Sequence, residues 1–183
     1  TTGAPLTILF ENTNTRSHDY SQFRDVPRPG HADFVSMHKF KGFDDYRGGG
    51  HFSGRLTLGL VAAGVVARKV ADPITVSSRI LEVGGSSDIE KAIDAAVEKG
   101  DSIGGIIECT ATGLPVGLGE PFFDSVVAVL SHMVFSIPAI KGIEFGSGFG
   151  AAKMKGSEHN DWFVEKTGKT ATNYAGGING GIT

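Results

Sequence analysis

Residues 74–112 read ITVSSRILEVGGSSDIEKAIDAAVEKGDSIGGIIECTAT, and this stretch decides the fold class. Polar and apolar residues alternate over residues 74–83, and apolar residues run through 103–112, which is typical of two strands. Between them, Ser87-Asp88-Ile89-Glu90 has the form of a capping box that opens a helix, and Gly100 ends that helix. The stretch therefore predicts a strand, a helix and a second strand.

Two further helices are predicted, one on each side of this stretch. Ser53 can cap the first, and Asp72-Pro73 ends it. Its apolar residues recur at helical spacing: Leu56, Leu60, Ala63, Gly64, Ala67 and Val70. The second spans residues 122–137 and ends before Pro138. Together with the central stretch, they predict a mixed α/β chain.

The other segments are shorter or less regular. Strands are predicted over residues 6–12 and 140–145, and the tail from Gly146 is glycine-rich and irregular. Residues 22–54 show little periodicity. A connection of that length is uncommon in a compact domain unless it has a function or contains short elements, so we expect site loops there.

Length and composition limit the classes of protein to which the chain can belong. The chain has 183 residues, of which 40% are hydrophobic and 20% charged, and we expect residues 1–183 to form a single domain. No apolar run approaches the length of a membrane span, and the first ten residues lack the basic leader of a secretory signal, so we expect a cytoplasmic protein. The single Cys109 is predicted to be a buried strand residue and not a reactive thiol.

The charge is unevenly distributed along the chain. Residues 16–79 hold ten Lys and Arg against six Asp and Glu, whereas residues 80–183 hold seven against thirteen. There is no dense basic stripe interleaved with aromatic residues, which argues against a nucleic-acid partner. A small anionic ligand fits the basic part better, although charge can also scatter over a solvated surface without any function.

Two clusters in the basic part join histidine and arginine to glycine hinges. The first is Arg28-Pro29-Gly30-His31-Ala32-Asp33, in which Asp33 could orient the His31 ring for acid/base work. The second runs from Tyr46 to Arg55 and contains Gly48-Gly49-Gly50, whose backbone could approach an anion. A structural histidine in a turn and a flexible glycine hinge are the alternatives.

A metal site is a further alternative, because His18, His31, Asp33, His38 and His51 lie in a short span. Their spacing matches no zinc motif and there is no cysteine pair, so we expect no metal.

Five ordered motifs together resemble chorismate synthase over essentially the whole chain. They are Arg28-Pro29-Gly30-His31-Ala32-Asp33, Asp45-Tyr46-Arg47-Gly48-Gly49-Gly50, Gly117-Leu118-Gly119-Glu120-Pro121-Phe122-Phe123-Asp124, Lys141-Gly142-Ile143-Glu144-Phe145-Gly146-Ser147-Gly148-Phe149 and Gly176-Gly177-Ile178-Asn179-Gly180-Gly181-Ile182. Five motifs of this length in one order make chance agreement implausible.

The resemblance implies a phosphate lyase of the shikimate pathway to aromatic amino acids. That family converts 5-enolpyruvylshikimate 3-phosphate to chorismate and phosphate by a 1,4-elimination that requires reduced FMN. It implies a homotetramer with an α+β fold, a β-α-β sandwich of antiparallel sheets with helices packed between them. NADPH is one candidate for the reductant of the flavin.

The resemblance also assigns roles to residues of this chain. His31 matches a catalytic histidine beside the flavin, and Arg28 and Arg55 match arginines that hold the anionic substrate. The flavin contacts that carry over are His51, Phe52, Ser53, Pro138, Ala139 and Gly180. His51-Phe52-Ser53 stands where the family usually has Arg-Ser-Ser, and Leu56 stands where many members have Glu, so those side-chain roles carry over less evenly than backbone contacts.

Some of the family's motifs are not found in residues 1–183. These are the first catalytic histidine, in Gly-Glu-Ser-His-Gly, and the later Lys-Pro-Thr-Ser-Ser and Arg-His-Asp-Pro segments. We therefore expect these residues alone to be inactive. A catalytically silent flavin- or phosphate-binding module is the alternative function.

Overall fold

The computed structural model describes residues 2–183, and its sheet has two antiparallel strands, β1 (Thr75–Val83) and β2 (Gly105–Thr112). Thr75 pairs with Thr112 at one end and Val83 with Gly105 at the other, and the register shifts once between Ile80 and Glu82. The helix α3 (Ile89–Glu98) connects the strands, and the Asp88 carboxylate caps it by accepting the Lys91 amide. The strand, helix and strand predicted from residues 74–112 are confirmed.

Helices account for most of the remaining regular structure. The α-helices are α1 (Asp33–Lys39), α2 (Thr57–Val70), α4 (Val126–Phe135) and α5 (Gly156–His159). Five 3-10 helices complete the described elements: η1 (Ser17–Arg24), η2 (Arg47–Phe52), η3 (Gly54–Leu56), η4 (Phe122–Asp124) and η5 (Gly148–Lys153). The helix predicted after Ser53 is confirmed as η3 followed by α2. The helices α1, η1, η2 and η5 were not predicted.

The helix predicted over residues 122–137 is wrong at its start. Phe122–Asp124 form η4, in which Phe122 has φ 65°, a left-handed value that an α-helix does not accommodate. The α-helix begins after Ser125, whose hydroxyl caps it by accepting the Ala128 amide at 3.3 Å.

Two predicted strands are also wrong. Neither residues 6–12 nor residues 140–145 form a strand in the described chain. An alternating segment becomes a strand only where a partner supplies hydrogen bonds, and neither segment has one within residues 2–183. Cys109 lies on β2 as predicted, but it is exposed, because no layer of the described chain covers the sheet there.

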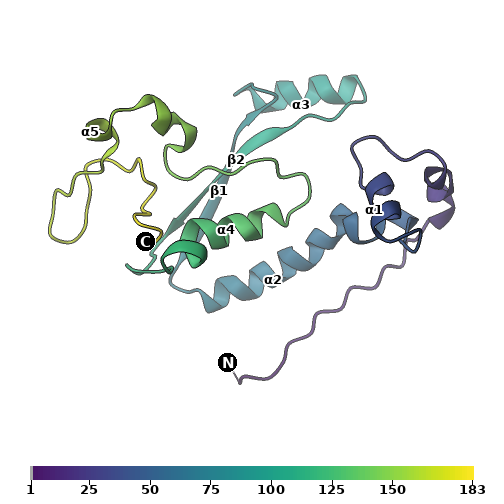
Figure 1. Cartoon of the computed structure of the whole chain (residues 1–183), viewed down its shortest axis with the longest axis horizontal. Helices are drawn as coiled ribbons and strands as arrows, with labels where there is room; N and C mark the ends of the chain where they lie inside the picture. Colours follow the sequence, from purple (N-terminus) through teal and green to yellow (C-terminus); the bar gives the residue numbers. More distant parts are fainter. Residues whose placement is uncertain (1) are drawn as a thin grey trace.

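Figure 1 shows how these elements are arranged. The helix α2 connects a lobe formed by η1, α1 and η2 to the sheet, and the tail after α4 lies on the opposite side of the molecule from that lobe. The N-terminal end of α2 therefore lies beside the two clusters that the sequence singled out.

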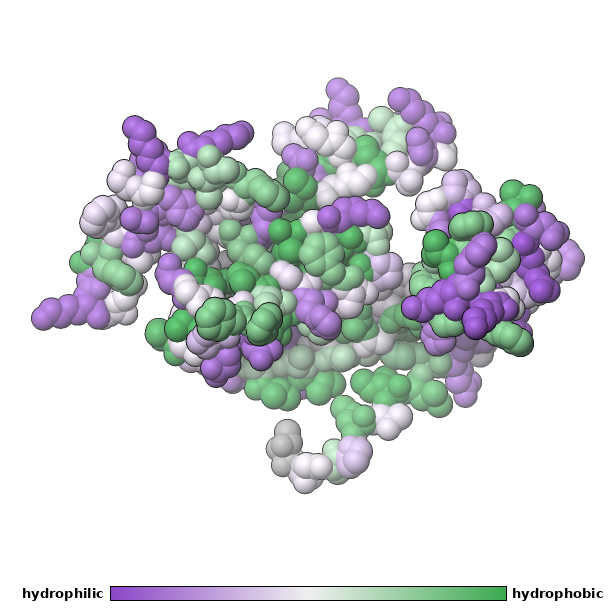
Figure 2. All heavy atoms as spheres, in the orientation of Figure 1, coloured by the Kyte–Doolittle hydropathy of each residue, from purple (hydrophilic) through white to green (hydrophobic). Residues whose placement is uncertain are grey.

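The described chain buries very little apolar surface. Val83 is its only buried hydrophobic residue. The accessible area is 14866 Å², whereas a compact monomer of 19.1 kDa exposes about 8,400 Å². Ile106 and Ile107, which point to opposite faces of the sheet, are 52% and 65% exposed. Figure 2 shows apolar residues on the outer surface over α2 and α4.

Every helix within residues 2–183 is too short or too polar to serve as a membrane span.

Candidate active site

The first cluster is built around an ion pair between Arg28 and Asp33. Arg28 Nε donates to Asp33 Oδ2 and Nη2 donates to Oδ1, both at 2.8 Å, and the Arg28 amide also donates to Oδ2 at 3.0 Å. Asp33 is the first residue of α1, and Gly30 in the preceding turn has φ 69°. The hydrogen bonds from Arg28 hold the pKa of Asp33 well below its usual range. The carboxylate is therefore ionised at neutral pH.

Two aromatic rings from η1 hold the other side of the Arg28 guanidinium. Its Cζ lies 4.8 Å from the centre of the Phe23 ring and 5.6 Å from that of Tyr20. With Nε and Nη2 bound to Asp33, only Nη1 has no hydrogen-bond acceptor among residues 2–183. Most of this guanidinium is therefore occupied within the chain.

His31 lies between this ion pair and the glycine loop. Its Nδ1 is 3.1 Å from Arg28 Nη2 and 2.7 Å from Asp33 Oδ1. The opposite edge of the ring faces Gly49, where an added Cβ would lie 3.1 Å from both Cε1 and Nε2. The His31 side chain is 27% exposed, so the ring remains accessible. The structure thus brings the two clusters together, which the sequence could not show.

The glycine loop has a backbone that only glycine adopts readily. Gly48, Gly49 and Gly50 have φ values of 62°, 82° and 49°, all in the left-handed region. A Cβ on Gly48 would overlap the Arg55 guanidinium, and one on Gly50 would lie 2.5 Å from the Asp45 carbonyl oxygen. The loop therefore lies between His31, next to Gly49, and Arg55, next to Gly48.

Arg55 differs from Arg28 in having no acidic partner within the described residues. Its Nε donates to the Ser53 hydroxyl at 3.0 Å, and its Nη2 donates to the Gly48 carbonyl at 3.2 Å. Neither acceptor is charged, so the positive charge of Arg55 is not neutralised inside the described chain. This is the arrangement that suits binding of an anion.

The predicted flavin contacts lie in three places. His51 and Phe52 are exposed at the end of η2, and Ser53 is 9% exposed with its hydroxyl bonded to Arg55. Pro138 and Ala139 follow the C-terminal end of α4, and Ala139 has φ 70°.

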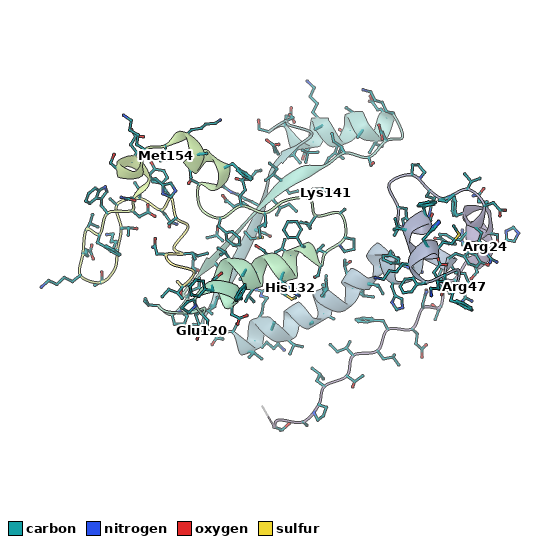
Figure 3. All side chains as sticks on the ribbon, viewed as in Figure 1. Arg24, Arg47, Glu120, His132, Lys141 and Met154 are labelled. Atoms are coloured by element: carbon teal, nitrogen blue, oxygen red, sulfur yellow. The ribbon has the colours of Figure 1, made fainter. Side chains whose placement is uncertain are left out.

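Gly180 lies at the other end of α4, because the neighbouring Gly181 carbonyl accepts the Val126 amide at 2.8 Å. Ten helical residues separate the two ends by about 15 Å. Figure 3 shows the same separation, with Lys141 beyond one end of α4 and Glu120 by the other. The described chain does not gather all six residues at one point.

One supporting contact was missed by the sequence reasoning. The buried hydroxyl of Ser36 on α1 donates to Asp44 at 2.9 Å, and so attaches α1 to the segment that leads into η2. Nothing in the local sequence indicates this pairing, because both residues read as ordinary polar positions.

The sequence profile of the family described as chorismate synthase matches residues 1–183. The chain is 66% identical over 184 residues to a chorismate synthase of Chitinophaga pinensis, and 44% identical over 211 residues to one of Pyrococcus abyssi. A crystal structure of a chorismate synthase superposes with a TM-score of 0.72 at 27% identity, covering 83% of this chain and 58% of that one.

The chain belongs to the chorismate synthase family. It spans between 55% and 59% of the length of these curated relatives, and all of its own residues lie within the matched part.

Within this member of the chorismate synthase family, the five motifs gather in two clusters. The first two meet where His31 contacts Gly49. The other three meet around the tail: the Gly117 amide donates to the Thr183 carbonyl at 2.8 Å, and the Ser147 amide donates to the Tyr174 carbonyl at 2.7 Å. The three predicted catalytic and substrate-binding residues, Arg28, His31 and Arg55, all lie in or next to the contact between the first two motifs.

The site formed by Arg28, His31, the glycine loop and Arg55 is an open surface in this part of the chorismate synthase fold. Shallow hollows are lined by residues 43–47 and by residues between 163 and 168, and neither contains a predicted site residue. Among residues 2–183 no group of three or more His, Cys, Asp and Glu side chains is placed to hold a metal ion.

Proposed function

We propose that the chain is the part of a chorismate synthase that carries His31 and one substrate arginine. The reaction would be the 1,4-elimination of phosphate from 5-enolpyruvylshikimate 3-phosphate to give chorismate. The observation that carries the proposal is the match of all 183 residues to the family profile, with 66% identity to the Chitinophaga pinensis protein. The arrangement of His31, Gly49 and Arg55 supports it.

Arg55 is the residue best suited to hold the anionic substrate. The substrate carries a phosphate and two carboxylates, and Arg55 presents a positive charge that no acidic residue in the described chain neutralises. Its Ser53 and Gly48 contacts orient the guanidinium without consuming the charge. Binding a charged group through an oriented guanidinium is favourable when the site excludes water.

His31 is the residue best suited to exchange a proton or to polarise an acceptor atom. Its Nε2 edge faces the backbone of Gly49, and 27% of its side chain is exposed. Proton transfer by a positioned imidazole contributes typically 10²–10⁴-fold to a rate, as an order of magnitude.

The family resemblance implies a flavin beside the glycine loop, where Gly48, Gly49 and Gly50 hold a left-handed backbone that places His31 and Arg55 on either side of it. His51, Phe52 and Ser53 would hold the cofactor from this loop, with Pro138, Ala139 and Gly180 as contacts from the two ends of α4. When bound, reduced FMN supplies the electron density that lets phosphate leave, and NADPH is one candidate for its reductant. The backbone groups of this chain would bind and orient it.

The chemistry requires a site closed to water, and the first cluster is open in the described chain. We infer that closure comes from assembly into a homotetramer with the β-α-β sandwich fold of antiparallel sheets, of which residues 1–183 form one domain. Residues 1–183 alone are then inactive. Chorismate formation by a purified polypeptide of only these residues would contradict this inference.

The activity is tested by substitution of His31 in the full-length protein, assayed with reduced FMN and substrate. His31→Ala is expected to lower kcat by about 10²-fold or more while leaving substrate binding largely intact. The control is His38→Ala, since His38 is exposed on α1 and its Nδ1 contacts only the Phe34 carbonyl. Unchanged turnover in His31→Ala would favour a silent flavin- or phosphate-binding module.

A further inference from the structure

The neighbours of His31 Nδ1 decide which ring nitrogen carries the proton when the ring is neutral. Nδ1 lies 2.7 Å from Asp33 Oδ1 and 3.1 Å from Arg28 Nη2, and Nη2 donates to the same Oδ1 at 2.8 Å. These three distances form a triangle, so a single hydrogen of Nη2 faces both Oδ1 and Nδ1. The ionised carboxylate attracts that hydrogen more strongly than a neutral ring nitrogen does. The carboxylate is therefore the neighbour that sets the protonation of Nδ1.

The short distance between Nδ1 and Oδ1 requires a proton on Nδ1. An ionised carboxylate can only accept hydrogens, so an unprotonated Nδ1 would set two lone pairs against each other at 2.7 Å. A proton on Nδ1 turns this repulsion into an attraction between a positive hydrogen and a negative oxygen. Because the neutral ring has only one proton, Nε2 then carries none.

We propose that Asp33 is a positioning residue that keeps a proton on Nδ1 of His31, so that Nε2 is the nitrogen that exchanges a proton with a bound ligand. In the neutral ring Nε2 accepts a proton, and in the cation Nε2 gives it back, while Nδ1 stays protonated in both forms. The inference deepens the proposed function and rests on it for its catalytic meaning.

Arg28 acts on His31 through Asp33. Its Nε and its backbone amide both donate to Oδ2, at 2.8 and 3.0 Å, and its Nη2 donates to Oδ1. These three bonds fix the carboxylate with Oδ1 toward the ring, and they keep it ionised by lowering the pKa of Asp33. Arg28 thus has a role in the chain itself, apart from the substrate contact that the resemblance implies.

The Nε2 atom is available to a ligand in the described chain. It faces the backbone of Gly49, and 27% of the His31 side chain is exposed. Both polar contacts of the ring within residues 2–183 are made by Nδ1. The neutral ring therefore presents an acceptor, which suits a ligand atom that carries an exchangeable N–H or O–H proton.

The tautomer can be measured directly by ¹⁵N solid-state NMR of the full-length protein labelled at histidine, with the His31 signals assigned from a His31→Gln variant. The spectrum is recorded at about pH 9, where an ordinary histidine is neutral. We expect the proton on Nδ1 in the wild type. A proton on Nε2 overturns the proposal, and this outcome is read from the wild-type protein, whose folding no substitution impairs.

The role of Asp33 is tested by Asp33→Asn, which keeps the size of the side chain. The Oδ2 position faces two Arg28 donors, so the remaining oxygen is expected there and the NH2 group at the Oδ1 position, opposite Nδ1. An NH2 group can only donate, so the ring proton moves to Nε2. We expect the tautomer ratio to shift toward Nε2–H by about tenfold or more, the equivalent of one hydrogen bond.

The matched control is Asp45→Asn. Asp45 also accepts the Nε, Nη2 and backbone amide of an arginine, Arg47, but it has no contact with His31. This variant should keep the wild-type tautomer of His31. An unchanged tautomer in Asp33→Asn, or an equal shift in both variants, overturns the positioning role.

Kinetics of the full-length protein separate positioning from substrate binding. Asp33→Asn is expected to lower kcat by about 10²-fold or more, with the substrate KM within about twofold. A raised KM with unchanged kcat would overturn the proposal. The NMR measurement requires neither substrate nor flavin, so a protein with the Nδ1–H tautomer but no lyase activity would refute the proposed function alone.

Discussion

Gly49→Ala should impair catalysis through the His31 ring, without touching any charged group. Gly49 is buried in η2 with φ 82°, and an added Cβ would lie 3.1 Å from His31 Cε1 and Nε2. Carbon atoms in contact prefer about 3.5–4.0 Å, so the ring must move by a few tenths of an ångström. A ring that moves by this amount cannot keep both the 3.1 Å contact with Arg28 and the 2.7 Å contact with Asp33.

The Gly49→Ala substitution has two effects that can be measured separately, one on folding stability and one on catalysis. The left-handed backbone costs an alanine about 1–2 kcal/mol of folding stability. The displaced ring adds a catalytic cost, and we expect kcat to fall by about tenfold to a hundredfold, within the range for a misplaced acid/base group. KM for the substrate should change little, because the atoms that an added Cβ on Gly49 would meet belong to His31 and Ser53 and not to Arg55.

The chain supplies a matched control in Gly42→Ala. Gly42 has φ 80°, nearly the same as Gly49, but a Cβ there would meet no atom within 4 Å. Both variants should lose similar stability in urea unfolding of the full-length protein, and only Gly49→Ala should lose kcat in the chorismate assay. If kcat falls equally in the two variants, or in neither, the contact between Gly49 and His31 does not position the ring.

Two further predictions concern the charged groups. Arg55→Gln should raise the substrate KM by about tenfold or more, the equivalent of one lost bond between charged groups. The control Arg47→Gln should change KM little, because Arg47 already pairs with Asp45 at 2.8 Å. Similar KM values in both variants would refute the role of Arg55. The lowered pKa of Asp33 makes its contribution to stability complete above about pH 4 and lost as the pH falls toward its folded value, so the stability gap between wild type and Asp33→Asn should narrow on acidification. A gap that stays constant in urea unfolding down to the acid limit of folding would contradict the lowered pKa.

Local signals in the sequence were enough for part of the fold. The capping box at Asp88 and the alternation over residues 74–83 act between near neighbours, so the strand, helix and strand could be predicted with good bounds. The start of α4 was missed because Phe122 and Phe123 continue the apolar pattern of the helix. They are 89% and 92% exposed, and Ser125 begins the helix instead.

Non-local features could not be predicted in the same way. Whether residues 140–145 pair with another strand depends on residues far away in the chain, and the alternation of the segment says nothing about them. The candidate site also combines contacts that local sequence predicts with contacts that it does not. Arg28, His31 and Asp33 lie within six residues, and their association followed from the sequence, including the approach of Asp33 to the ring. The contact of His31 with Gly49 depends on how α1 and η2 pack, which no local pattern encodes.

The exposed apolar surface and the open site are physically connected. Leu58, Val61 and Val65 on α2 are 50%, 67% and 57% exposed, and a helix that is apolar on all sides is stable only when it is covered. Arg55 in η3 directly precedes this helix. A charge pair at 4 Å is worth about 1 kcal/mol in water and about 4 kcal/mol at the effective dielectric constant near a protein surface. Whatever buries α2 also removes water beside Arg55, so the same contact that stabilises the fold strengthens the attraction of this guanidinium for an anion.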